Sequence, residues 1–143
     1  MINVSRTFTV DKPADVVVAY LADFGNAEQW DPGTVSCTRA DSGPVQVGST
    51  WNNVSKVLGR ETTLDYRLER LEPGRVTLVG RNDTATSTDD ITVRPSGGGS
   101  EVTYDATVEL NGLAKLAYPV MRLEFRRLAN KTEAQIKAAV AGL

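Results

Sequence analysis

The chain has 143 residues, a formal net charge of −2 and a sequence pI of about 5.2, and its composition is that of an ordinary globular protein. This length predicts one domain over residues 1–143, and the charge argues against a nucleic-acid or anionic-membrane surface. Histidine, the commonest general base and metal ligand, is absent, so we expect neither a metal site nor a cofactor.

The single cysteine, Cys37, cannot form an internal disulfide, which fits a reducing compartment. No N-terminal run resembles a signal peptide, and no apolar run is long enough to span a bilayer. We therefore expect a cytoplasmic protein, monomeric or homodimeric, without stable membrane insertion. Cys37 has no histidine to activate it and falls on a short strand that we expect to be exposed, so we interpret it as structural.

Alternating apolar and polar residues predict a strand over residues 2–10. Arg6 interrupts this alternation, because it falls on an apolar position. Two interpretations stay open. The side chain extends to water near the end of the strand, or it is a buried guanidinium directed at a carboxylate or a ligand.

Two short helices are predicted next. The first follows Pro13 and covers residues 14–23. Its expected apolar face consists of Val16, Val17, Tyr20 and Leu21. The second is a short helical segment from Gly25 to Trp30, and it ends at a turn formed by Asp31-Pro32-Gly33.

Six further strands are predicted, over residues 35–39, 50–58, 61–72, 76–80, 84–94 and 101–110. Short turns separate most of them, and the glycine-rich residues 95–100 are expected to form a flexible hairpin loop. Strands joined in this way favour one curved antiparallel sheet, which has seven strands when residues 2–10 are included.

The last quarter of the chain predicts one long helix from Pro119 to Ala141, about 35 Å in length. Its apolar residues recur at helical spacing, and they are Met121, Phe125, Leu128, Thr132, Ile136, Ala139, Val140 and Leu143. Because such a helix cannot bury this stripe alone, we expect it to lie on the concave side of the sheet, with a pocket between them.

Three stretches carry a resemblance to a known family: KPADVVVAYLADFGNAEQWDPG near the N-terminus, LDYRLERLEPGR in the middle, and GGGSEVTYDATVELNG before the long helix. Their order and spacing resemble the START-like (SRPBCC) helix-grip superfamily, in particular its polyketide cyclase/dehydrase and lipid-transport branch. The resemblance implies an α+β fold in which a curved antiparallel seven-stranded sheet wraps around the C-terminal helix, with two short helices between strands 1 and 2. It also implies a hydrophobic cavity that binds lipids, polyketides or other apolar molecules, or that supports cyclase, aromatase or dehydratase chemistry.

Aromatic residues with polar tips are the first candidates for the pocket wall, because a buried hydroxyl or indole N–H needs a partner. They are Tyr66, Tyr104 and Trp51, whereas Trp30 is expected, from the family pattern, to close the end that carries the short helices.

Polar residues at inward-facing strand positions, such as Asn53, Ser87 and Asp89, have two explanations. They face a cavity that holds water or ligand, or a β-bulge returns Asp89 or its neighbour Asp90 to solvent. The predicted ligand-binding residues are Trp30, Trp51, Asn53, Tyr66, Leu68, Leu78, Ser87, Asp89, Tyr104, Ala106, Met121, Phe125 and Leu128.

Three functions follow as hypotheses. The favoured one is binding, for transport or sequestration, of an apolar small molecule such as a lipid, isoprenoid or polyketide. The alternative is a polyketide cyclase/dehydratase-type enzyme that uses Asp89 with a cavity tyrosine; its catalytic candidates are Asp89, Tyr66, Tyr104 and Arg6. The third is a partner-binding module with a collapsed cavity, acting through the basic helix face at Arg122, Arg126 and Arg127.

Overall fold

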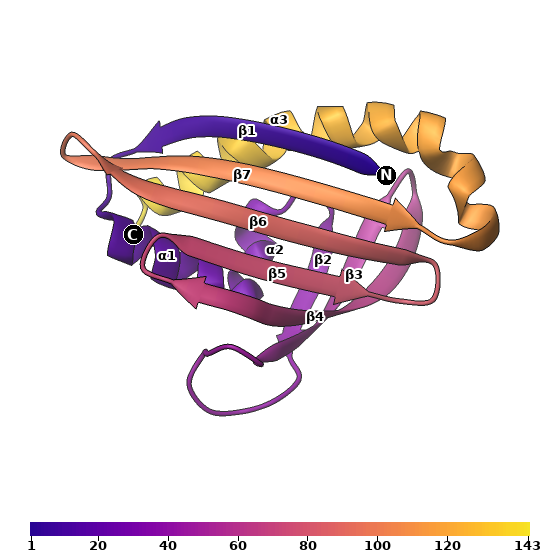
Figure 1. Ribbon diagram of the computed structural model, residues 1–143, viewed down its shortest axis with the longest axis horizontal. Helices are drawn as coiled ribbons and strands as arrows, with labels where there is room; N and C mark the ends of the chain where they lie inside the picture. Colours follow the sequence, from indigo (N-terminus) through magenta and orange to yellow (C-terminus); the bar gives the residue numbers. More distant parts are fainter.

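The computed structural model describes all residues from Met1 to Leu143, and its main feature is one antiparallel sheet of seven strands (Figure 1). The strands are β1 (Ile2–Val10), β2 (Thr34–Arg39), β3 (Thr50–Val57), β4 (Arg60–Glu72), β5 (Arg75–Arg81), β6 (Ala85–Ser96) and β7 (Gly99–Leu110). Their order in the sheet is β1-β7-β6-β5-β4-β3-β2. The strands from β2 to β7 thus form a meander, and β1 pairs with β7.

The helices are α1 (Ala14–Ala22), the 3-10 turn η1 (Phe24–Asn26), α2 (Ala27–Trp30), the 3-10 segment η2 (Gly112–Ala117) and α3 (Tyr118–Ala141). The long helix α3 lies along β1 and also contacts α2 (Figure 1). The predicted helix-grip fold is therefore confirmed. None of the helices is both long enough and apolar enough to cross a lipid bilayer.

Two local predictions were wrong in part. The glycine-rich residues 95–100 do form a hairpin, but its loop is shorter than predicted, because β6 and β7 continue their pairing as far as Ser96 and Gly99. Gly97, with φ +57°, adopts the left-handed conformation that such a tight hairpin needs. In α1, Val16 is 38% exposed and Val18 is buried instead, so the buried side of this helix is rotated from the predicted one.

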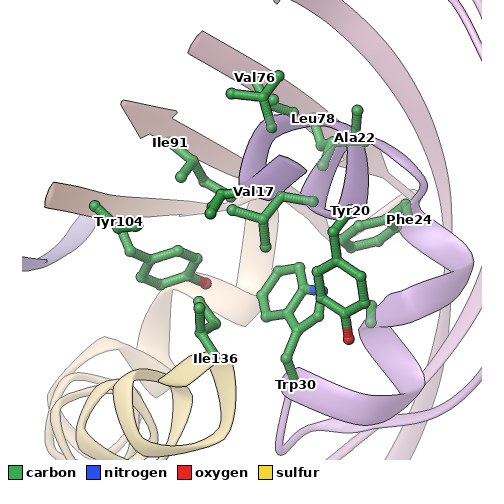
Figure 2. Packing of buried hydrophobic residues seen from close by; sticks show 14 of the residues in the cluster. Val17, Tyr20, Ala22, Phe24, Trp30, Val76, Leu78, Ile91, Tyr104 and Ile136 are labelled. Atoms are coloured by element: carbon green, nitrogen blue, oxygen red, sulfur yellow. The ribbon is translucent and has the colours of Figure 1, made fainter. Parts of the chain in front are cut away.

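Aromatic rings fill the core where α1 and α2 meet the sheet (Figure 2). The Phe24 ring centroid lies 4.4 Å from that of Tyr66 and 5.9 Å from that of Trp30, and the Trp30 ring lies edge-on to Tyr104 at 6.1 Å. The C-terminal half of α3 adds Ile136, which is fully buried beside this cluster. This end of the sheet is therefore packed with side chains, as in other protein interiors.

Cys37 is buried, contrary to the prediction of an exposed strand. Its backbone N–H donates a hydrogen bond to Glu28 Oε2 of α2 at 2.8 Å, so α2 covers this part of β2. Burial, together with the negative charges of Glu28 and Asp31, raises the pKa of the Cys37 thiol to about 11. The thiol is therefore protonated at neutral pH, which agrees with a structural role.

Candidate functional site

A cavity of about 570 Å³ lies between the sheet and the N-terminal half of α3. This volume is in the range of small-molecule binding sites. Most of the wall is apolar: Val4, Leu64, Ala106 and Val108 come from the sheet, and Phe125 comes from the helix. The cavity is thus the space left where α3 covers the sheet without filling its concave side.

The exposed lining residues identify the mouth of the cavity. They belong to the turn between β3 and β4 (Leu58 and Gly59), to the turn between β5 and β6 (Thr84) and to η2 (Ala117). These segments meet at one end of the sheet, on the right in Figure 1. Tyr118 Oη accepts a hydrogen bond from the Leu110 N–H at 2.8 Å, which holds the start of α3 at the end of β7.

Many of the predicted ligand-binding residues meet in this cavity, namely Tyr66, Ser87, Asp89, Tyr104, Ala106, Met121, Phe125 and Leu128. Trp30, Trp51, Asn53, Leu68 and Leu78 are buried but do not line it. Strand alternation identifies the inner face of a sheet, but it does not say how far along the strand the packed core ends and the cavity begins.

Asp89 points into the cavity and is only 6% exposed. The register of β6 is continuous with both neighbours, and it places Asp89 opposite Leu78 on one side and Ala106 on the other. The register shifts of the sheet lie elsewhere, in β2 and β4. The alternative of a β-bulge at Asp89 was therefore wrong.

The carboxyl group of Asp89 accepts a hydrogen bond from Tyr104 Oη at 2.7 Å. Burial raises the pKa of Asp89 to about 7, the nearby charge of Asp31 adds to this, and the bond from Tyr104 opposes it. Burial, followed by the charge of Asp89, also raises the pKa values of Tyr66 and Tyr104 well above their usual range. The site thus holds two neutral hydroxyl donors and one carboxyl group that changes its charge near neutral pH.

Asp31 is a cavity residue that the sequence analysis treated only as part of a turn. Its carboxylate accepts hydrogen bonds from Thr34 Oγ1 at 2.7 Å and from the Gly33 N–H at 3.1 Å. Thr34 Oγ1 in turn accepts one from Asn53 Nδ2 at 3.1 Å, and Ser55 Oγ donates to Asn53 Oδ1. The sequence signal for this hydrogen-bonded turn is an aspartate with Gly two residues later and Thr three residues later.

Burial raises the pKa of Asp31, although its bonds from Thr34 and Gly33 oppose the shift. The cavity therefore has two carboxyl groups, and the charge of Asp31 raises the pKa of Asp89. Arg60 is the one cationic side chain among the lining residues, and it lies at the mouth.

Arg6 does not line the cavity. Its guanidinium donates to Asn130 Oδ1 at 3.0 Å and to the carbonyl oxygens of Ser5 and Arg126, along the outer side of α3. Because β1 is an edge strand, a long side chain at an inward position can extend past the helix to the surface. The interpretation of Arg6 as a buried guanidinium directed at a carboxylate or a ligand was wrong.

A model of the family described as polyketide cyclase / dehydrase and lipid transport matches residues 1–141. The chain belongs to this family. No curated protein matches its sequence. The description of this family covers both enzymes and lipid transport, so family membership alone does not choose between these roles for the cavity.

Solved structures share the fold over nearly the whole chain. A START superfamily protein from Mycobacterium smegmatis superimposes with a TM-score of 0.72 at 17% identity, over 98% of this chain and 94% of that chain. The Zhui aromatase/cyclase from Streptomyces sp. R1128 superimposes with a TM-score of 0.74 at 16% identity, over 98% and 91%. At these identities the likeness shows the fold, which is the START-like architecture that the sequence predicted.

Proposed function

We propose that the protein binds an apolar small molecule, such as a lipid, isoprenoid or polyketide, between the sheet and α3. The observation that carries this proposal is the cavity of about 570 Å³ with its largely apolar wall. Filling it removes apolar surface of ligand and wall from water, which contributes about 25 cal/mol per Å². A cytoplasmic location accords with the one unpaired cysteine, Cys37.

The polar residues on the inner side of the cavity orient the ligand. Tyr104 engages one oxygen of Asp89, which leaves Oδ2 for a hydroxyl, amine or similar donor on the ligand. Tyr66 offers a second neutral hydroxyl on the same wall. A few polar groups in an apolar cavity are the arrangement through which small-molecule sites select orientation and chemical class.

Native mass spectrometry of the purified protein, followed by denaturing extraction, tests the proposal. We expect a co-purifying apolar molecule whose mass identifies its class. The variant Ala106→Leu extends a side chain into the cavity. It should lower ligand occupancy and leave the circular dichroism spectrum unchanged. A wild-type protein that carries no ligand from its own host, and binds none of a panel of lipids and polyketides, would contradict the proposal.

A second candidate function is that of a cyclase/dehydratase-type enzyme. It is favoured by the pKa of about 7 of Asp89, since a carboxyl group that gains and loses its proton near neutral pH is suited to general acid–base catalysis. Tyr104, bonded to Asp89, or Tyr66 would then stabilise charge on a reacting carbonyl oxygen.

The test of this second candidate is Asp89→Asn, assayed on a poly-ketone substrate analogue. Turnover should fall by at least about a hundredfold, the usual contribution of a general acid or base. Binding of the analogue, measured in the same preparation, should persist. Turnover retained in the variant would remove Asp89 from the catalytic role.

A further inference from the structure

Four large apolar side chains lie exposed on η2 and the first turns of α3. They are Leu113 (87% exposed), Leu116 (81%), Val120 (58%) and Leu123 (68%), and we call them the outer stripe. Residues three apart in a 3-10 segment or an α-helix lie on the same side, so each of the two elements contributes one pair to a common surface. Leu113 and Leu116 are the most exposed of the large apolar side chains in the protein.

The N-terminal half of α3 is therefore apolar on two sides. Met121, Phe125 and Leu128 line the cavity, whereas Val120 and Leu123 belong to the outer stripe. The sheet covers the side that lines the cavity, but nothing in this chain covers the outer stripe. Contiguous exposed apolar surface on a folded protein marks a site of interaction.

The outer stripe borders the mouth of the cavity. Ala114 and Ala117, from the same segment, line the cavity itself. Across the mouth, Leu58 is 55% exposed at the tip of the hairpin between β3 and β4, next to Arg60. Both segments lie at the same end of the molecule (Figure 1). An apolar ligand that enters or leaves there passes between exposed apolar side chains.

The charge of this segment is opposite to that of the molecule. Residues 112–131 contain five Lys or Arg residues and one Glu, although the whole chain has a net charge of −2. The cations are Lys115, Arg122, Arg126, Arg127 and Lys131, and the anion, Glu124, is paired with Arg127. The net charge of the whole chain therefore does not describe this basic segment. It does not justify the expectation that the chain lacks a surface for anionic membranes.

We propose that the outer stripe and its flanking cations dock the mouth of the cavity on an anionic phospholipid bilayer. The apolar side chains enter the region of headgroups and acyl chains, the Lys and Arg residues attract anionic headgroups, and an apolar ligand passes between bilayer and cavity without crossing water. A second copy of the chain is a poorer occupant, because pairing would bring two basic surfaces together. The passage of ligand rests on the proposed binding function, whereas the docking itself rests on the surface alone.

The test is co-sedimentation of the full chain with vesicles of phosphatidylcholine and phosphatidylglycerol in equal parts, and with vesicles of phosphatidylcholine alone. We expect binding to the anionic vesicles that weakens as salt is raised. The triple variant Leu113→Gln/Leu116→Gln/Leu123→Gln should bind at least about tenfold more weakly, because it removes most of the apolar surface that enters the lipid. Since all three residues are exposed, the variant should keep the wild-type circular dichroism spectrum.

Two further variants sharpen the test. Lys115→Gln/Arg122→Gln should weaken binding to the anionic vesicles and flatten its salt dependence. Val47→Gln is the matched control, because Val47 is 52% exposed but lies in the loop before β3, outside the outer stripe; it should bind as the wild type does.

Failure of the wild type to bind anionic vesicles, or equal binding by the triple variant, would overturn the proposal. A wild-type dimer in solution that the triple variant dissociates, without vesicle binding, would also overturn it in favour of a second copy. Native mass spectrometry without vesicles separates the two proposals. A filled cavity without vesicle binding overturns docking alone, whereas stripe-dependent vesicle binding by a chain that takes up no ligand supports docking and overturns the binding function.

Discussion

Two adjacent aspartates of β6 face opposite sides of the sheet and have opposite pKa shifts. Asp89 lies in the cavity, where burial raises its pKa to about 7. Asp90 lies on the outer side, where the bidentate pair with Arg75, at 2.7 and 3.0 Å, lowers its pKa. The alternation of a regular strand thus places Asp90 in an ion pair on the outer face and Asp89 in a buried position, where its partner is the neutral hydroxyl of Tyr104.

The first prediction concerns Asp89→Asn and pH. Between its ordinary pKa of 3.8 and its folded pKa of about 7, Asp89 keeps its proton in the folded chain and loses it in the unfolded chain. The free energy of unfolding therefore falls as pH rises through this window, by about 1.4 kcal/mol per pH unit from this group. The variant lacks that fall, so its stability relative to the wild type should be higher at pH 8 than at pH 4.5.

Urea unfolding of both proteins at the two pH values measures this difference. Asp90→Asn is the matched control. Because the pKa of Asp90 is lowered in the folded chain, its contribution is present above pH 4 and lost as pH falls, so this variant should lose stability at pH 8 and less at low pH. Stability relative to the wild type should thus rise with pH for Asp89→Asn and fall with pH for Asp90→Asn. A change in the same direction for both variants would contradict the assignment of their environments.

The second prediction concerns Tyr104→Phe. The hydroxyl of Tyr104 donates to Asp89 and holds the pKa of that carboxyl below the value that burial alone would give. Its removal should raise the pKa of Asp89 further, as carboxyl NMR titration would show. If the pair orients the ligand, the variant should also change selectivity across a ligand panel more than it changes stability. An unchanged selectivity profile would argue against a polar role for Tyr104.

At the scale of elements, the two halves of α3 have different surroundings. Its C-terminal half, with Ile136 and Val140, is packed core, whereas Phe125 and Met121 of its N-terminal half form a cavity wall. The third prediction follows. Ile136→Ala opens a void in packed surroundings and should cost about 2–5 kcal/mol, whereas Phe125→Ala enlarges a space that already exists and should cost less, although it removes the larger side chain.

Urea unfolding of these two variants decides the order. Phe125→Ala should also shift the ligand preference toward larger molecules, since it adds volume to the cavity. A greater loss of stability in Phe125→Ala than in Ile136→Ala would mean that the N-terminal half of α3 is packed as tightly as the C-terminal half.

The fourth prediction concerns contact between β4 and β5. Gly80 of β5 lies under the ring of Tyr66, and a Cβ atom at this position would lie 2.4 Å from Tyr66 Cε2. Gly80→Ala should therefore displace the ring and cost about 1–3 kcal/mol, as overpacking does. A double-mutant cycle with Tyr66→Leu should recover part of this loss, and strict additivity would show that the ring is not what the new methyl group meets.

Much of the element structure could be predicted from the sequence because it is encoded locally. The alternation in β7 and the helical spacing in α3 are short-range patterns, and the inward position of Asp89 follows from the same alternation. The network of Asp31, Thr34 and Asn53 could not be predicted, because it joins the end of α2 to β2 and β3. Burial of Cys37 depends likewise on the contact of Glu28 with a different element.

The molecule as a whole has a packed core at one end of the sheet and a cavity at the other. Ligand that fills the cavity binds only the folded state, so it should raise stability by about 2.7 kcal/mol at a free concentration of a hundred times its Kd. The fifth prediction is that this gain is unevenly distributed. Hydrogen exchange should slow most in η2, the N-terminal half of α3 and the hairpin between β3 and β4, which border the cavity.

Amide exchange with and without a bound apolar ligand measures this distribution. The strands around Leu68 and Leu78, which are fully buried away from the cavity, serve as the internal reference, and their exchange should change little beyond the global gain. Equal slowing at both ends would indicate that the ligand acts on the whole sheet and not on the elements around the mouth.

The burial of Cys37 also equips the molecule with an internal probe. It is the chain's one thiol, and both its inaccessibility and its pKa of about 11 protect it from alkylating reagents in the folded state. Reaction with such a reagent requires an opening that exposes β2, such as the separation of α2, whose Glu28 accepts from the Cys37 N–H. The rate of Cys37 alkylation in the unmodified protein therefore measures how often this end of the molecule opens. A change in that rate when ligand binds would show that opening at the packed end is coupled to ligand binding in the cavity.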